Sequence, residues 1–135
     1  MINTPLKYYF VALVLLVFST LSIADESKDS FLQDLTAEAA AELIAKNPDY
    51  VILDVRTPLE YGLSHIENAI NINYYSLSFK SKLSKLDKNK TYILHCQTGV
   101  RSGKTIPIMQ KAGFTKIYHL NGGFSEWKKA KLPIK

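Results

Sequence analysis

The chain has 135 residues, 47% of them hydrophobic and 21% charged, with a formal net charge of +5 at pH 7. This length and balance suit one small globular domain. The lysines are scattered, with a modest cluster over residues 80–90, so the positive charge predicts a solvated face and specifies no nucleic-acid partner. Cys96 is the single cysteine, which excludes a disulfide within the chain.

Residues 1–24 differ in kind from the rest of the chain. Lys7 is their one charged residue, and residues 10–18 are an unbroken apolar run. Ser22 and Ala24 are small residues at the positions that a signal peptidase recognises before the cleavage site. We therefore expect a signal peptide cleaved after Ala24, a periplasmic or secreted mature protein, and no stable membrane association after cleavage. An uncleaved anchor is the alternative, although the apolar run is shorter than the ~20 residues that span a bilayer.

Residues 25–34 are polar and predict a flexible lead-in to a folded domain over residues 35–135. In that domain, short apolar runs that predict strands alternate with segments of helical periodicity. The predicted strands are residues 50–53, 69–72, 91–95 and 116–120. The predicted helices are residues 36–46, a segment that begins at Thr57, a segment with Phe79, Leu83 and Leu86 on one face, and residues 102–112 and 124–130. Pro107 lies inside one of them and predicts a kink there. The alternation predicts an α/β fold with a largely parallel central sheet flanked by helices.

Polar residues between the first predicted strand and the next helix indicate a locally braced turn. Thr57 is a suitable N-cap, Pro58 suits the first helical position, and Glu60 completes a capping box. Asp54 and Arg56 come directly before them. We expect Asp54, Arg56 and Glu60 to form a local network of ion pairs and capping bonds with a structural role.

Cys96 lies on a tight turn between the strand over residues 91–95 and the helix over residues 102–112. Open α/β sheets bind ligands at such turns, and amides at a helix start favour a thiolate. Gly99 lets the backbone curl with its amides inward, and Arg101 adds a permanent cation. A lone cysteine is more often a buried, inert hydrophobe, but this spacing and context favour a nucleophile.

The sequence gives none of the three histidines a catalytic or metal-binding role. His95 precedes Cys96 on a strand, and because side chains alternate along strands it should point away from the thiol. His65 and His119 are isolated, and no two histidines have the spacing of metal ligands. We therefore expect no metal site.

The chain resembles a single-domain rhodanese, in an exported form, over roughly residues 35–129. Three ordered segments carry the resemblance. They are residues 96–102; Asp54, Val55 and Arg56 with Glu60, Tyr61, His65, Ile66 and residues 69–72; and Gly122, Gly123 and Trp127. Ser64 and Asn68 depart from the family pattern, which usually has glycine at both positions, and these departures concern the geometry of the upstream turn.

The resemblance implies a sulfurtransferase that moves sulfane sulfur from a small anionic donor such as thiosulfate to cyanide or a thiol. Cys96 is the implied catalytic residue and would carry the sulfur as a persulfide. The residues implied to bind the substrate are Gln97, Thr98, Gly99, Val100, Arg101 and Ser102. Arg101 would neutralise the sulfur donor and brace the loop, and Ser102 would cap the following helix. No metal or organic cofactor is implied.

Two other functions remain open. A cysteine-based phosphatase or arsenate reductase uses a related loop, but its signature has five residues between cysteine and arginine, whereas four lie between Cys96 and Arg101. A shorter loop makes a smaller ring of amides, which suits one sulfur atom better than a tetrahedral phosphate. The second alternative is a sulfur-carrier or binding module without turnover.

Overall fold

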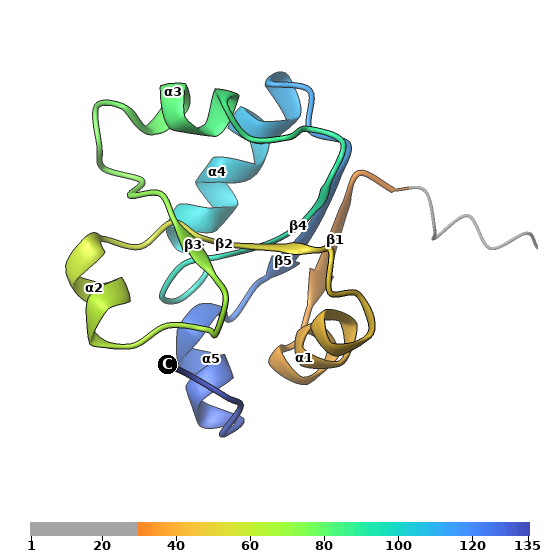
Figure 1. Cartoon of the computed structure of the whole chain (residues 1–135), viewed down its shortest axis with the longest axis vertical. Coiled ribbons are helices and arrows are strands. Elements are labelled where there is room, and N and C mark those ends of the chain that lie inside the picture. Colours follow the sequence, from red (N-terminus) through yellow and green to blue (C-terminus); the bar gives the residue numbers. More distant parts are fainter. Residues whose placement is uncertain (1–29) are drawn as a thin grey trace, which may run out of the picture.

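The computed structural model describes residues 30–135, which form a five-stranded sheet between two layers of helices (Figure 1). The strands are β1 (Leu32–Leu35), β2 (Val51–Asp54), β3 (Ile70–Asn71), β4 (Thr91–His95) and β5 (Lys116–Leu120). The helices are α1 (Ala37–Lys46), α2 (Pro58–Leu63), α3 (Phe79–Ser84), α4 (Val100–Lys111) and α5 (Gly123–Lys129). The strand order is β1-β5-β4-β2-β3 and each pairing of neighbours is parallel, so the predicted α/β fold is confirmed.

Each face of the sheet has its own apolar core. Figure 1 shows α3 and α4 on one side of the sheet and α1 and α5 on the other. Along β2, Leu53 packs into the first core and Ile52 into the second, and in β4 Leu94 and Ile93 divide in the same way. Because these central strands are covered on both faces, their sequences contain consecutive apolar residues, Val51 to Leu53 in β2 and Tyr92 to Leu94 in β4, rather than alternating ones.

The local signals at the start of α2 act as expected, whereas α4 differs in where it begins. The hydroxyl of Thr57 accepts the Glu60 N–H at 3.3 Å and the Glu60 carboxylate accepts the Thr57 N–H at 2.9 Å, which completes the capping box. Helix α4 runs through Pro107, whose side chain is exposed. That helix begins at Val100, two residues earlier than the sequence predicts.

The strand β1 corrects the predicted flexible lead-in at residues 32–34. It pairs in parallel with β5 at the edge of the sheet, and Asp34 lies opposite His119 in the register. The strand is short, and its Gln33 and Asp34 are exposed, so its sequence lacks the apolar run of the central strands. Pairing with the β5 backbone therefore makes this segment a strand, and local propensity does not.

The predicted signal peptide over residues 1–24 lies outside the described residues. Within residues 30–135, no helix is both long enough and apolar enough to cross a membrane.

Candidate active site

Cys96 follows β4, the central strand of the sheet, and leads into the loop before α4. Its side chain is buried, with 1% of its surface exposed. The Gly99 N–H donates to Sγ at 3.1 Å, and the Ser102 hydroxyl oxygen lies 3.4 Å from Sγ. The thiol is therefore held between the backbone of the loop and the first turn of a helix.

The start of α5 determines which way the loop peptides face. The Phe124 N–H donates to the Cys96 carbonyl at 2.8 Å, and the Ser125 N–H donates to the Gln97 carbonyl at 3.0 Å. Gly123 makes this approach possible, because it has φ +63° and a Cβ there would lie 2.6–2.7 Å from the two loop carbonyl oxygens. With these carbonyls bound to α5, the amides that follow are free to face the sulfur.

These hydrogen bonds control the ionisation of Cys96. Burial by itself raises the pKa of the thiol, but bonds from the Ser102 hydroxyl and from the backbone N–H groups of Ser102, Thr98 and Gly99 outweigh it. The net result is a pKa below the usual value for cysteine. The site therefore favours the thiolate, which is the nucleophilic form.

Arg101 is paired with Glu60 of α2. Its two terminal nitrogens each donate to one carboxylate oxygen at 2.7 Å, a bidentate arrangement. The hydrogen bonds from Arg101 lower the pKa of Glu60 to about 2, although burial opposes them. Arg101 therefore links the start of α4 to α2, and its charge is balanced within the protein.

Arg56 forms a second, fully buried pair beneath the loop. Its Nε and one terminal nitrogen bind the Asp54 carboxylate at 2.8–3.1 Å, and the same terminal nitrogen donates to the Ser64 carbonyl at 2.8 Å. Its other terminal nitrogen donates to the Gln97 side-chain oxygen at 3.2 Å. The Asp54–Arg56 part of the predicted network is therefore confirmed, whereas Glu60 pairs with another arginine.

His95 does not reach the thiol. Its Nδ1 lies 3.1 Å from the Cys96 carbonyl oxygen, and its Nε2 lies 3.6 Å from the Asp54 carboxylate. Burial lowers the pKa of His95 and outweighs the opposing effect of Asp54. The net effect favours the neutral ring. The expectation that this histidine is not the base for Cys96 agrees with these contacts.

Ser102 and His119 differ from the sequence-based expectations. The N-cap of α4 is Gly99, so Ser102 does not cap the helix; its Oγ contacts the Gly99 carbonyl oxygen at 3.1 Å as well as the thiol. His119 is not isolated, because its Nε2 lies 2.8 Å from Ser102 Oγ and its Nδ1 lies 3.0 Å from the Asp34 carboxylate. Its place near the carboxyl end of a strand beside β4 was the available signal, because parallel strands end at one edge.

Three of the six loop residues predicted to bind the substrate, namely Thr98, Gly99 and Ser102, contact Sγ. Thr98 and Gly99 donate backbone N–H groups to the Cys96 sulfur. The Gln97 side chain instead donates to the Ser125 hydroxyl of α5 at 3.0 Å. The Val100 side chain is 62% exposed. Their binding of a substrate stays a prediction. Over residues 30–135, no group of three or more His, Cys, Asp or Glu side chains could hold a metal ion.

The chain belongs to the rhodanese-like domain family, whose model matches residues 36–130. It is 38% identical over 82 residues to a probable adenylyltransferase/sulfurtransferase MoeZ of Mycobacterium tuberculosis, a match over 61% of this chain and 21% of that protein. It is 35% identical over 112 residues to a tRNA uridine(34) hydroxylase of Hamiltonella defensa, over 76% of this chain and 31% of that protein. The chain thus spans less than a third of the length of each.

The fold also matches solved structures of this family. A rhodanese-related protein from Thermoplasma volcanium superposes with a TM-score of 0.63 at 28% identity, over 76% of this chain and 97% of that one. Fold and site together define a rhodanese-like domain with a loop cysteine, and its relatives include a protein named for sulfur transfer and one named for tRNA hydroxylation.

Proposed function

We propose that the protein is a sulfurtransferase that carries sulfane sulfur as a persulfide on Cys96. The observation that supports this most strongly is the environment of Sγ. The atom accepts a hydrogen bond from the Gly99 N–H and contacts the Ser102 hydroxyl, and the pKa of the thiol is below its usual value. The same groups can hold the terminal sulfur of a persulfide, which is also an anion.

The reaction proceeds in two displacements. The Cys96 thiolate attacks the outer sulfur of a small anionic donor such as thiosulfate, and sulfite leaves with the electron pair of the broken S–S bond. The new S–S bond leaves a persulfide anion on Cys96. Cyanide or a thiolate then attacks the terminal sulfur, the persulfide bond breaks, and the Cys96 thiolate is restored.

Two features favour sulfur over phosphate as the transferred group. Four residues separate Cys96 from Arg101, one fewer than in the phosphatase signature, so the ring of amides is small. The Arg101 guanidinium is also held by both oxygens of Glu60, so its charge is already balanced when a substrate arrives. A phosphate dianion needs several free donors at ~2.7–3.2 Å, and this arginine offers few.

The deciding experiment is mass spectrometry of the purified protein after incubation with thiosulfate. We expect a gain of one sulfur atom on Cys96, its removal by cyanide as thiocyanate, and no gain in the Cys96→Ser variant, because a hydroxyl does not form a persulfide. Circular dichroism of the variant serves as the control for folding. Cleavage of an aryl phosphate that depends on Cys96, without sulfur loading, would support the phosphatase alternative and refute the proposal.

Turnover separates an enzyme from a sulfur carrier. Repeated formation of thiocyanate by one molecule of protein supports the sulfurtransferase. A single round of loading and unloading, with no catalytic rate above that of free thiol, supports the carrier without turnover.

We also propose that residues 1–24 are a signal peptide and that the protein acts in the periplasm or outside the cell. The support is the short apolar run that ends before Ser22 and Ala24. N-terminal sequencing of the exported protein should begin at Asp25. Recovery of an intact Met1 in the membrane fraction would instead indicate an anchor.

A further inference from the structure

Four side chains, from β1, β5, α4 and the loop after β4, form a continuous line that ends at Cys96. Ser102 Oγ lies 3.4 Å from Cys96 Sγ and 2.8 Å from His119 Nε2, and His119 Nδ1 lies 3.0 Å from an Asp34 carboxylate oxygen. The sheet register produces the last contact, since Asp34 and His119 are directly opposite each other in β1 and β5. The loop cysteine is thus connected to a histidine on β5, the strand next to the edge strand β1.

The donors and acceptors along this line allow two complete arrangements. An ionised Asp34 only accepts, so His119 Nδ1 carries a proton in both. In the first, the thiol donates to Ser102 Oγ and the hydroxyl donates to a neutral His119 Nε2. In the second, His119 Nε2–H donates to Ser102 Oγ and the hydroxyl donates to the thiolate. The Gly99 carbonyl, 3.1 Å from Ser102 Oγ, is an alternative acceptor that competes for the single hydroxyl proton.

We propose that His119 is a positioning residue that receives the proton of the Cys96 thiol through the Ser102 hydroxyl. The S–H proton moves to Ser102 Oγ as the hydroxyl proton moves to His119 Nε2, so Ser102 is unchanged. The products are a thiolate and an imidazolium that faces the Asp34 carboxylate. The inference rests on the proposed function for its purpose, because sulfur transfer needs the thiolate, but the ionisation can be measured without any sulfur donor.

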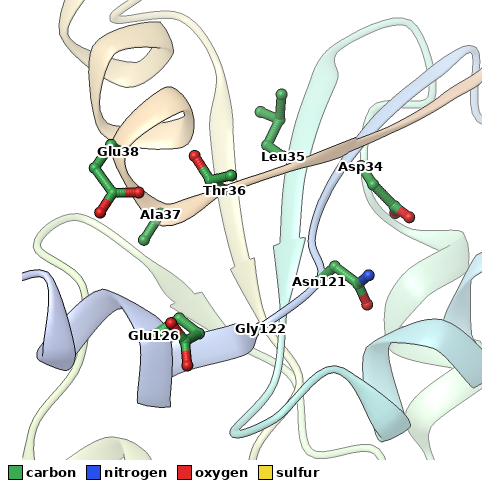
Figure 2. Close-up of a pocket in the computed structure, with 8 residues that line it drawn as sticks. All are labelled: Asp34, Leu35, Thr36, Ala37, Glu38, Asn121, Gly122 and Glu126. Atoms are coloured by element: carbon green, nitrogen blue, oxygen red, sulfur yellow. The ribbon is translucent and has the colours of Figure 1, made fainter.

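Burial explains why the proton needs a relay. Cys96, Ser102 and His119 are all buried, whereas the Asp34 side chain is 60% exposed. Asp34 lines a pocket of about 380 Å³ together with Thr36, Glu38, Asn121 and Glu126 among others. Figure 2 shows Asp34 at one end of this pocket and the carboxylates of Glu38 and Glu126 at the other. The line therefore opens to solvent at its acidic end.

The other charged groups around Cys96 and His119 have partners or are neutral. Arg101 at the start of α4 is paired with Glu60. On the other side, the buried Asp54 of β2 is paired with Arg56. Burial lowers the pKa of His95 of β4, and its ring contacts the Cys96 carbonyl rather than Sγ. The Asp34–His119 pair is therefore the titratable system that these contacts connect to the thiol.

The test is the rate at which iodoacetamide alkylates Cys96 as a function of pH, because this rate follows the thiolate fraction. In His119→Gln, the side-chain amide still donates to Ser102 but takes no proton. We expect the midpoint of its rate profile to lie about one pH unit higher than in the unmodified protein. On the acidic side of the midpoint, alkylation is then about tenfold slower. His65→Gln is the matched control, because His65 contacts the Tyr61 carbonyl and not this line, and its profile should equal that of the unmodified protein.

A double-variant comparison shows whether His119 acts through Ser102. In a Ser102→Ala background, His119→Gln should change the profile no further, because the connection is already broken. Asp34→Asn, at an exposed position, keeps an acceptor without the charge and should move the profile in the same direction as His119→Gln. If His119→Gln does not fold, the alkylation profile of Asp34→Asn tests the proposal in its place. Superimposed profiles for the unmodified protein and the folded single variants would overturn the proposal.

Nuclear magnetic resonance of the imidazole supplies a readout that a purely structural role would not move. Coupling is reciprocal, so the Cys96 thiolate must favour the His119 imidazolium as much as the imidazolium favours the thiolate. The titration midpoint of His119 should therefore fall when Cys96 is replaced by alanine, and an unchanged midpoint would contradict the relay. A protein that shows this coupling but no sulfur loading refutes the proposed function alone, and loading without the coupling refutes the relay alone.

Discussion

Replacing Glu60 by glutamine tests how the active-site loop is fastened to the rest of the domain. The Glu60 carboxylate accepts two bonds of 2.7 Å from Arg101, and it also accepts the Thr57 N–H at 2.9 Å. Glutamine can keep the capping bond through its carbonyl oxygen, but it loses the charge and one acceptor. The substitution therefore removes the ion pair between α2 and α4 with little change in shape.

The lowered pKa of Glu60 gives the size of the expected loss in stability and the direction in which that loss depends on pH. A fall from 4.5 to about 2 corresponds to at most about 3.5 kcal/mol, at 1.36 kcal/mol per pH unit. The pair is partly exposed, with side-chain exposures of 14% and 30%, so solvent screening reduces the expected loss to about 1–2 kcal/mol at pH 7. Because the folded pKa is depressed, this stability is present above about pH 4.5 and is lost as the pH falls towards about 2.

Urea denaturation from pH 7 down to pH 3 measures this loss for Glu60→Gln. Glu42→Gln is the matched control, since Glu42 pairs with Lys46 at 3.5 Å and both side chains are 73% exposed. That pair should contribute under about 0.5 kcal/mol. A loss for Glu60→Gln equal to that of the control, or one that does not shrink on acidification, would refute the reasoning.

Further substitutions probe the scaffold around the loop. Gly123→Ala should cost about 2 kcal/mol in urea denaturation and reduce sulfur transfer, because its Cβ would lie 2.6–2.7 Å from the loop carbonyl oxygens at a positive φ. Gly103→Ala in α4 has nothing within 4 Å of the new Cβ and should instead add about 0.5–1 kcal/mol; equal effects would contradict the steric argument. Arg56→Lys should cost about 3 kcal/mol by the same measurement, since ammonium cannot serve Asp54, Ser64 and Gln97 at once, and a loss below about 0.5 kcal/mol would show that the buried pair is dispensable.

Much of the fold could be predicted because its signals are local. The apolar runs of β2 and β4 identify strands covered on both faces, and the Thr57–Glu60 capping box marks the start of α2. The turn that presents Cys96 is also local, because the β4 strand, Gly99 and the start of α4 lie within a few residues of it. These features depend on hydrogen bonds and side-chain periodicity within one element.

The strand β1 and the partners of the site residues could not be found in this way. Glu60 meets Arg101 across 41 residues of sequence, and Asp34 meets His119 across 85. Neither spacing carries a pattern, because each contact depends on which strands and helices the sheet places side by side. His119 is isolated in the sequence, and its contact with Ser102, made possible by the place of β5 beside β4, connects it to the loop.

The sequence by itself therefore determined the class of fold and the turn that carries Cys96 between β4 and α4, since these follow from interactions within short segments. The tertiary structure alone decided that Arg101 is balanced by Glu60 and that a line of side chains runs from Cys96 to Asp34. The physical reason is the parallel order β1-β5-β4-β2, which brings the carboxyl ends of distant strands, and the segments that follow them, to one edge of the sheet.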